Sequence, residues 1–381
     1  MLYITFNDYP GGIYYSQVID VVKYLKEWLL KDKVKLVAFI SLRKFFVNRK
    51  KIKQRCPDAL VLPMFPGVHN WRWNRIWMFF LSLFFFRTAV ICRGVFAFHI
   101  VYPFRNLGFF SGIVLDARGA YKAEFEEYSV VPDKKLIRDV GILERDAVWK
   151  ADFNLAVSWA LCRYWQREFQ YHKNNYVVIP CTLSDDFIKS FPSERELAQL
   201  KQQAGFFERD IVIVFAGSVA GWQSLEQMDR WFVPLLTYQP SVKLLMLGPH
   251  LLEKYKVYQL FPNRVFQREV EANKVLEYLY IADYGWLLRE KSVTSAVASP
   301  VKFAEYLAGG LKVLISPHVG DYSEFCRQHL CGLIVEDNEV LPELSSVVYS
   351  EKVRLHRLAM RYFTKSVFRS EYEKILNAVR L

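Results

Sequence analysis

The 381-residue chain lacks the cysteine spacing of common metal and redox sites. Its six cysteines include no Cys-x-x-Cys pair, and no group of His and Cys has zinc-site spacing. It also lacks an Asp-x-Asp pair of the kind that holds a divalent metal. Isolated cysteines of this sort are most often buried thiols. We therefore expect reduced cysteines, no metal and no cofactor.

Long hydrophobic runs are absent as well. The longest uncharged apolar run, residues 76–86, is far shorter than the roughly 20 residues that span a bilayer. Residues 1–6 are apolar, but no basic leader precedes them and Asn7, Asp8 and Pro10 follow, so we expect a buried strand rather than a secretion signal. These features predict a cytoplasmic protein, at most peripheral on the inner face of the membrane.

Acidic residues are scarce in the first quarter of the chain. Residues 1–100 hold 16 Lys and Arg against 5 Asp and Glu, whereas the remaining residues hold 35 against 34. Nearly all of the net charge of +12 therefore lies in one region. Such asymmetry indicates an anionic partner: a lipid surface, a lipid-diphosphate acceptor or nucleic acid. Because no nucleic-acid-binding motif is visible, we expect no specific nucleic acid.

Short apolar runs alternate with helical patterns along the chain. Runs that are apolar at every position are typical of strands buried on both faces of a parallel sheet, and alternation with helices indicates βαβ units. The first series comprises residues 2–6, 34–40, 59–63, 88–92, 112–116, 153–158 and 176–179. The second series comprises residues 211–216, 242–247, 264–266, 284–288, 312–316 and 332–335.

A polar stretch at residues 180–209 separates the two series. The sequence therefore predicts an α/β fold of two doubly wound, Rossmann-like domains facing across a cleft. We expect one domain over residues 1–182 and a second over residues 183–364. Residues 365–381 are expected to form a helix that packs back on the first domain.

The aromatic segment at residues 71–87 has two interpretations. It is either a helix buried between two strands or an interfacial helix, with Trp and Phe at the lipid headgroups. Arg72, Arg75 and Arg87 would then meet anionic lipid. The basic residues that precede it extend this predicted membrane surface over residues 43–87.

Two strand-to-helix turns are rich in small residues. Gly11 and Gly12 follow the first predicted strand, and Gly217 and Ser218 follow the first strand of the second domain. Glycine lets the backbone approach a ligand closely, and a helix start offers free N–H groups to a phosphate. Ligands of doubly wound sheets bind at this carboxyl edge. These residues are predicted to bind a ligand, with an ordinary turn as the alternative.

The clearest helix start follows the predicted strand at 284–288. Ser299 suits an N-cap and Pro300 suits the first helical position, so the sequence predicts a diphosphate site here. Lys302 falls in the first turn, where a cation opposes the helix dipole, and a bound anion would explain that placement. Glu305 lies one turn on, placed to accept hydrogen bonds from ribose hydroxyls. The alternative is an ordinary capped helix with a Lys302–Glu305 surface pair.

Residues 299–310, Ser-Pro-Val-Lys-Phe-Ala-Glu-Tyr-Leu-Ala-Gly-Gly, resemble the donor-binding motif of group 1 glycosyltransferases, the retaining family four with GT-B architecture. Residues 114–119, Val-Leu-Asp-Ala-Arg-Gly, resemble a stretch of that family's acceptor domain. The resemblance implies transfer of a sugar from a nucleotide-diphosphate sugar to a glycan or lipid-linked acceptor, in cell-surface polysaccharide biosynthesis. The resemblance does not distinguish among UDP-, GDP- and dTDP-sugars as the donor.

The resemblance also implies roles for individual residues. It makes residues 1–182 the acceptor-binding domain and residues 183–364 the nucleotide-sugar-binding domain, and it points to Lys302 and Asp116 as catalytic residues. The family's usual Arg and Lys in the first loop of the second domain are not evident around residues 218–223. We therefore expect Arg289, together with Lys302, to neutralise the leaving phosphate instead. Arg118 and Glu124 are expected to bind the acceptor, although Asp116 and Arg118 could equally form a structural turn. Often the family has a further glutamate eight positions before Glu305, where this chain has valine. The implied donor-binding residues are Gly11, Gly12, Gly217, Ser218, Ser299, Pro300, Val301 and Glu305.

Two other classes of function remain open. The basic first quarter would suit a non-catalytic module that docks on membrane or nucleic acid. A nucleotide-sugar epimerase has a similar two-domain build.

Overall fold

A computed structural model of the chain describes residues 1–29, 33–128, 133–217, 227–249, 252–271, 274–336 and 340–379. Contacts divide it into two compact units. The first comprises Met1–Ser184, Val297–Ser299 and Lys365–Leu381, and the second comprises Asp185–Ala296 and Pro300–Thr364.

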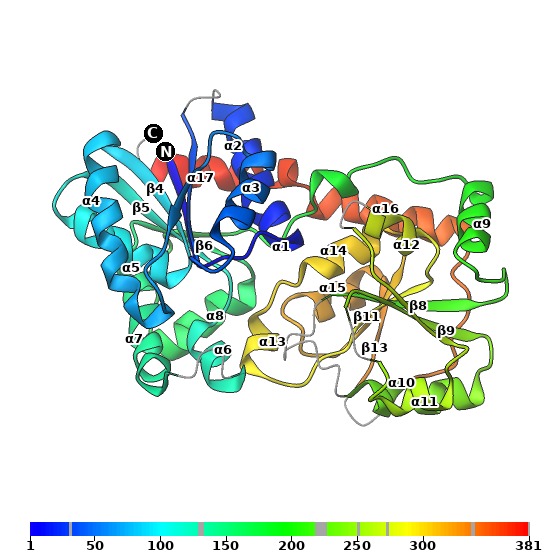
Figure 1. Ribbon diagram of the computed structural model, residues 1–381. Coiled ribbons are helices and arrows are strands. Elements are labelled where there is room, and N and C mark those ends of the chain that lie inside the picture. Colours follow the sequence, from blue (N-terminus) through cyan, green and yellow to red (C-terminus); the bar gives the residue numbers. More distant parts are fainter. Residues whose placement is uncertain are drawn as a thin grey trace. The chain divides into compact units, whose positions relative to one another are not determined.

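The first unit is built on a parallel sheet (Figure 1). Among the described residues it has seven strands in the order β3-β2-β1-β4-β5-β6-β7, all paired in parallel. The chain starts at β1 in the middle of the sheet and adds β2 and β3 on one side. It then crosses back and adds β4 to β7 on the other side. The strands are β1 (Leu2–Phe6), β2 (Lys35–Ile40), β3 (Leu60–Pro63), β4 (Thr88–Arg93), β5 (Phe110–Ala117), β6 (Phe153–Ala156) and β7 (Tyr176–Val178).

Helices cover both faces of this sheet. Alternate residues of β1 show why the strand is mostly apolar: Leu2, Ile4 and Phe6 enter the hydrophobic core on one face, and Tyr3 enters the core on the other. The helices of this unit are α1 (Gly12–Tyr14), α2 (Asp20–Leu29), α3 (Phe45–Arg55), α4 (Arg75–Phe84), α5 (Gly94–Asn106), α6 (Tyr121–Tyr128), α7 (Lys134–Lys150), α8 (Trp159–Phe169) and α17 (Arg369–Ala378). The last of these, α17, packs on β6 and β7.

The second unit repeats the plan. Among its described residues, six parallel strands have the order β10-β9-β8-β11-β12-β13. The strands are β8 (Ile211–Ala216), β9 (Val242–Leu247), β10 (Val265–Arg268), β11 (Tyr284–Leu287), β12 (Lys312–Ile315) and β13 (Gly332–Ile334). The helices are α9 (Glu194–Gln203), α10 (Met228–Tyr238), α11 (Lys256–Leu260), α12 (Val275–Tyr280), α13 (Val293–Val297), α14 (Val301–Ala308), α15 (Tyr322–His329) and α16 (Tyr349–Phe363).

The predicted strands are confirmed. Each apolar run forms a strand, with ends that differ from the prediction by at most two residues. Both units are doubly wound parallel sheets, as the alternation of strands and helices indicated. The six cysteines form no disulfide. Within the described ranges, no helix combines the length and the apolarity that crossing a membrane requires.

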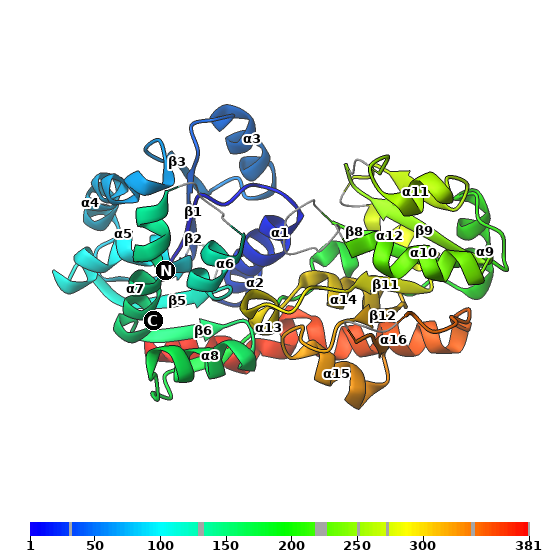
Figure 2. The ribbon, with the colours of Figure 1, turned by 90° about the horizontal axis from the view of Figure 1, so that it is seen from below.

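The aromatic segment at residues 71–87 forms a second layer of helix on the first unit. Helix α4 packs on α5, and α5 packs on β5 (Figure 2). Met78, Leu81 and Ser82 are buried, whereas Phe79 and Phe80 are exposed. The interpretation as a helix buried between two strands is therefore wrong, because only one face of α4 has a protein surface to cover it.

Candidate functional site

The second unit gathers several predicted residues at one sheet edge. Strands β8 and β11 are neighbours where the strand order reverses, and such a switch point is where ligands of doubly wound sheets bind. Gly217 follows β8, and Arg289 follows β11 by two residues. Because the strands are parallel, both residues lie at the carboxyl edge.

Helix α14 is fixed to this edge by a buried tyrosine. The backbone N–H of Ala216 donates to the Tyr306 hydroxyl over 3.2 Å, and that hydroxyl donates to the carbonyl of Trp286 over 3.3 Å. Gly285 makes room for the ring, since a Cβ there would lie 2.2 Å from it. The tyrosine thereby sets the position of the first turn of α14.

The start of α14 differs from the prediction. The helix begins at Val301 and its N-cap residue is Pro300, so the predicted cap at Ser299 is wrong by one residue. The Ser299 hydroxyl accepts a hydrogen bond from the backbone N–H of Cys181 over 2.8 Å, both residues belonging to the first unit. Val301 is buried in the first turn.

Lys302 is buried at this edge rather than paired on the surface. Its ammonium lies 4.0 Å from the centroid of the Phe215 ring, and a Cβ on Gly217 would be only 1.9 Å from Nζ. Glycine at 217 is therefore what leaves space for the lysine head. The alternative of a Lys302–Glu305 surface pair is wrong, because only 8% of Lys302 is exposed.

Arg289 is held beside it by the neighbouring strand. The Ser316 hydroxyl, directly after β12, accepts from the Arg289 N–H over 2.8 Å and donates to its carbonyl over 2.9 Å. His318 Nε2 lies 3.1 Å from the same carbonyl oxygen. Arg289 is itself 5% exposed, so a second cation is built into the edge.

The charges in this cluster perturb one another. Burial lowers the pKa of Lys302 well below its usual range, and the positive charge of Arg289 lowers it further. Burial raises the pKa of the Glu305 carboxyl to about 7, and the charge of Lys302 opposes that rise. Arg289, Lys302, Glu305 and Gly217 are thus brought together as an anion-favouring group. Ser218 lies outside the described residues.

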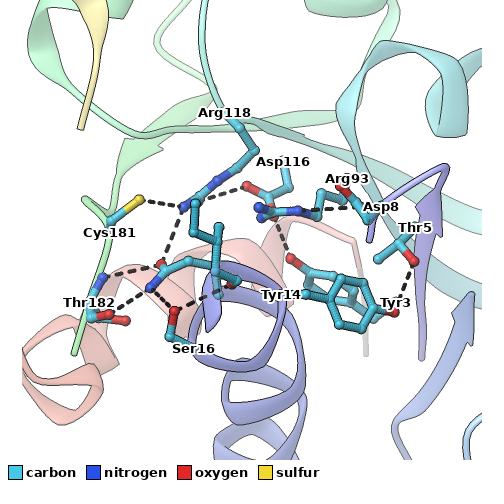
Figure 3. Close-up of polar contacts among 12 residues, drawn as sticks. Tyr3, Thr5, Asp8, Tyr14, Ser16, Arg93, Asp116, Arg118, Cys181 and Thr182 are labelled. Carbon is cyan, nitrogen blue, oxygen red and sulfur yellow. Dashed lines mark hydrogen bonds and ion pairs between the residues drawn. The ribbon is translucent and has the colours of Figure 1, made fainter. Parts of the chain in front are cut away.

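The first unit has its own buried charge network at the β1–β4 switch point (Figure 3). Asp116, 2% exposed, pairs with Arg93 at 3.4 Å and with Arg118 at 3.2 Å, and it accepts a hydrogen bond from the Tyr3 hydroxyl. Arg93 also pairs with Asp8 at 3.6 Å. Burial opposes the charge on Arg93, but these carboxylates raise its pKa above its usual value.

Arg118 is tied to the chain on several sides. Besides Asp116, its guanidinium contacts Gln17 Oε1 at 3.3 Å and Cys181 Sγ at 3.0 Å. Gln17 in turn exchanges hydrogen bonds with the backbone of Thr182. The geometry fits the structural turn left open for Asp116 and Arg118, extended into a network.

Several of these partners escaped the sequence prediction. Arg93, Gln17 and Cys181 were not singled out, and Asp8 was noted only as part of a turn. A signal existed for Arg93, which stands directly after the apolar run of β4 and so at the carboxyl edge. Gln17 sits in a π-helical turn, Tyr15–Ile19, which no spacing rule predicts.

Three further predicted residues, Gly11, Gly12 and Glu124, lie in the first unit. Gly11 is the N-cap of α1, and a Cβ on Gly12 would meet nothing within 4 Å, so neither residue is needed to relieve crowding. Glu124 lies on α6, where burial raises the pKa of its carboxyl. Among the described residues, no group of three His, Cys, Asp or Glu side chains is arranged to hold a metal ion.

The position of the family's further glutamate is a packing position here. Val297 is 2% exposed and lies in a hydrophobic core of the first unit. Its carbonyl accepts a hydrogen bond from the Ser158 hydroxyl over 2.7 Å. An unpaired carboxylate at this place would carry a large desolvation cost, so the apolar residue suits the structure.

No protein-family model and no curated protein sequence matches the chain significantly. Solved structures do. HepE from Anabaena, in complex with UDP, superimposes with a TM-score of 0.70 at 14% identity over 99% of both chains. Sucrose-phosphate synthase from Thermosynechococcus elongatus gives 0.68 at 12% identity, over 99% of this chain and 98% of that one. A putative UDP-N-acetylglucosamine 2-epimerase from Listeria monocytogenes gives 0.54 at 12%, over 100% and 90%.

These likenesses establish the architecture. The chain has the two-domain GT-B fold of its neighbours, as the sequence resemblance predicted. At such low identity they show the fold alone, and an epimerase shares it with the glycosyltransferases. Function must be argued from the residues at the sheet edges.

Proposed function

We propose that this chain is a glycosyltransferase that uses a nucleotide-diphosphate sugar. The observation that carries the proposal is the buried cation pair, Arg289 and Lys302, at the switch point of the second unit. Burying two positive charges side by side costs more free energy than burying either alone, because they repel each other. A bound diphosphate would offset that cost. HepE, which has the same fold, is described in complex with UDP.

In this proposal the second unit binds the donor. The diphosphate lies against Lys302, Arg289 and the first turn of α14, and Glu305 accepts hydrogen bonds from the ribose. When the glycosidic bond to the phosphate breaks, negative charge grows on the leaving diphosphate, and fixed cations stabilise it. The first predicted domain, residues 1–182, holds the acceptor, with Glu124 as a candidate contact. Gly11 and Gly12 supply an open backbone for the donor.

The finer assignment follows the resemblance to the retaining family four. Retention places the acceptor on the face from which the phosphate departs, and the phosphate takes the acceptor proton. The proposed acceptor is a glycan or lipid-linked sugar of cell-surface polysaccharide biosynthesis. No cofactor or metal is required in this scheme, because the two cations carry the charge.

A thermal-shift panel of UDP-, GDP- and dTDP-sugars tests the donor site. Ligand at a hundred times its Kd stabilises by about 2.7 kcal/mol, which is roughly 5 to 10 °C for a domain of this size. Lys302→Ala and Glu305→Ala should each abolish the shift while the protein stays folded. Retention of the shift in both variants would refute the site.

Lys352 offers a matched control in the same unit. It is also a buried lysine, 8% exposed, with a pKa that burial lowers to about 8. Its ammonium donates to the carbonyl of Ala282, at the opposite end of β11 from Arg289. Lys352→Ala should reduce stability and keep the donor shift.

The epimerase remains the second candidate because a putative epimerase has the same fold. An epimerase interconverts sugars and needs no acceptor, whereas a transferase releases nucleoside diphosphate in proportion to acceptor. Mass spectrometry of the donor sugar after incubation alone distinguishes them. Epimerised donor without acceptor would favour the second candidate.

A further inference from the structure

Helix α4 is apolar on two opposite sides. Its buried side, Met78, Leu81 and Ser82, rests on the first unit. A second set recurs at helical spacing of three and four residues but faces solvent. That set is Ile76, Phe79, Phe80, Leu83 and Phe84.

The exposure of this second set is large. Phe84 is 83% exposed, Leu83 54% and Phe80 51%, and the neighbouring Trp73 and Phe86 are 61% and 59% exposed. Phe79 and Phe80 pack edge to face on each other, 5.5 Å between ring centroids. A contiguous patch of this kind marks an interaction surface, since isolated exposed apolar residues are ordinary but clusters are not.

The charged residues of the segment that carries the patch have one sign. Residues 59–115, which contain α4, hold no Asp or Glu at all. Two exposed arginines bracket the patch, Arg72 over the ring of Trp71 at 4.6 Å and Arg87 near that of Phe86 at 5.8 Å. A surface of aromatic rings bordered by arginines complements an anionic lipid headgroup layer, where rings enter the acyl boundary and guanidinium groups stay among phosphates.

The size of the helix fits lying on a membrane rather than crossing it. Its ten residues are about 15 Å long, half the thickness of a bilayer core. We propose that the exposed face of α4, with Trp73 and Phe86, docks this protein on an anionic bilayer surface. The inference rests on α4 and the residues that flank it, and it stands independently of glycosyl transfer.

Vesicle flotation tests the proposal, with phosphatidylcholine alone and with added phosphatidylglycerol. The wild-type chain should float with the anionic vesicles, and Phe79→Ser with Phe80→Ser and Phe84→Ser should reduce the bound fraction about tenfold. These side chains face solvent, so the triple variant should keep its melting temperature. Phe207→Ser, at a 70% exposed ring of the second unit, is the matched control and should bind as the wild type does.

Two further readouts separate insertion from adsorption. Arg72→Gln with Arg87→Gln should remove the preference for anionic vesicles, and quenching of tryptophan by brominated lipid should fall in Trp73→Phe. Absence of wild-type flotation, or unchanged flotation of the triple variant, would overturn the proposal. The proposal would also be overturned if the wild type formed a dimer and bound no vesicles, and the triple variant were a monomer. In that case the patch would join two copies of the chain.

Discussion

The two units bury charge in opposite ways at equivalent places. At the switch point of the first unit, Asp8 and Asp116 are matched by Arg93 and Arg118, with ion pairs of 3.2 to 3.6 Å. At the switch point of the second unit, two buried cations, Arg289 and Lys302, lie with the Glu305 carboxyl among the described residues.

The difference fits a structural network in the first unit and the ligand site that we propose in the second. A balanced set of buried charges compensates itself and needs nothing further, although breaking it is costly. Burial, and after it the positive charge of Arg289, lowers the pKa of Lys302, and a bound anion would oppose both effects. Equal sheet topology therefore does not imply equal roles, and the charge balance supports the proposal that the edge of the second unit binds a phosphate.

The largest effect should come from breaking the balanced network. Asp116→Ala leaves Arg118 and Arg93 with too few carboxylates, so we expect the free energy of unfolding to fall by about 3 to 5 kcal/mol. Urea denaturation followed by tryptophan fluorescence measures it. Glu324→Ala, which removes an exposed pair with Arg327, should cost less than about 1 kcal/mol. Equal losses in the two variants would contradict the contrast between the units.

A smaller effect should follow from filling the space beside Lys302. In Gly217→Ala the new Cβ would stand 1.9 Å from Nζ, so the flexible head must move while the backbone stays. We expect UDP to bind about tenfold more weakly, equivalent to about 1.4 kcal/mol. Titration calorimetry measures this, and Gly119→Ala, where a Cβ meets nothing within 4 Å, should leave UDP binding unchanged. If Gly217→Ala bound UDP as tightly as the wild type, Lys302 would not contact the phosphate.

The smallest effect should be a change in pH dependence. Burial raises the pKa of Glu305 from 4.5 to about 7, so the folded state holds its proton while the unfolded state loses it. This contribution to stability is complete below pH 4.5 and is lost as the pH rises to about 7. Glu305→Gln should flatten that decline in melting temperature, whereas the exposed Glu324→Gln should not. If the melting temperature of Glu305→Gln declined with pH as steeply as that of the wild type, the Glu305 carboxyl would be solvent-exposed.

The sequence was most informative where burial dictates residue type. The sheets were predictable because strands covered on both faces must be mostly apolar, as β1 and β8 are. The group of Lys302, Glu305 and Gly217 was also predictable, since strand ends and helix starts in this topology meet at one edge. That Lys302 is buried was not predictable, because the space it occupies depends on a glycine 85 positions away.

The network of the first unit shows where pattern reasoning stops. Asp116 and Arg118 were noticed as a motif, but their partners Arg93 and Gln17 come from other elements. Such pairs join residues distant in sequence, and no local spacing encodes them. The predicted cap at Ser299 failed for a similar reason, since its hydroxyl accepts from the distant Cys181.

The last helix has a consequence for how the protein is made. Although β1 is synthesised first, the core beneath its sheet includes Tyr372, Ile375 and Val379. A Cβ at Gly112 on β5 would lie 2.8 Å from Val379, so the glycine leaves space for the end of this helix to pack on the sheet. On the ribosome, the part of this face over β6 and β7 therefore stays uncovered until α17 has been translated.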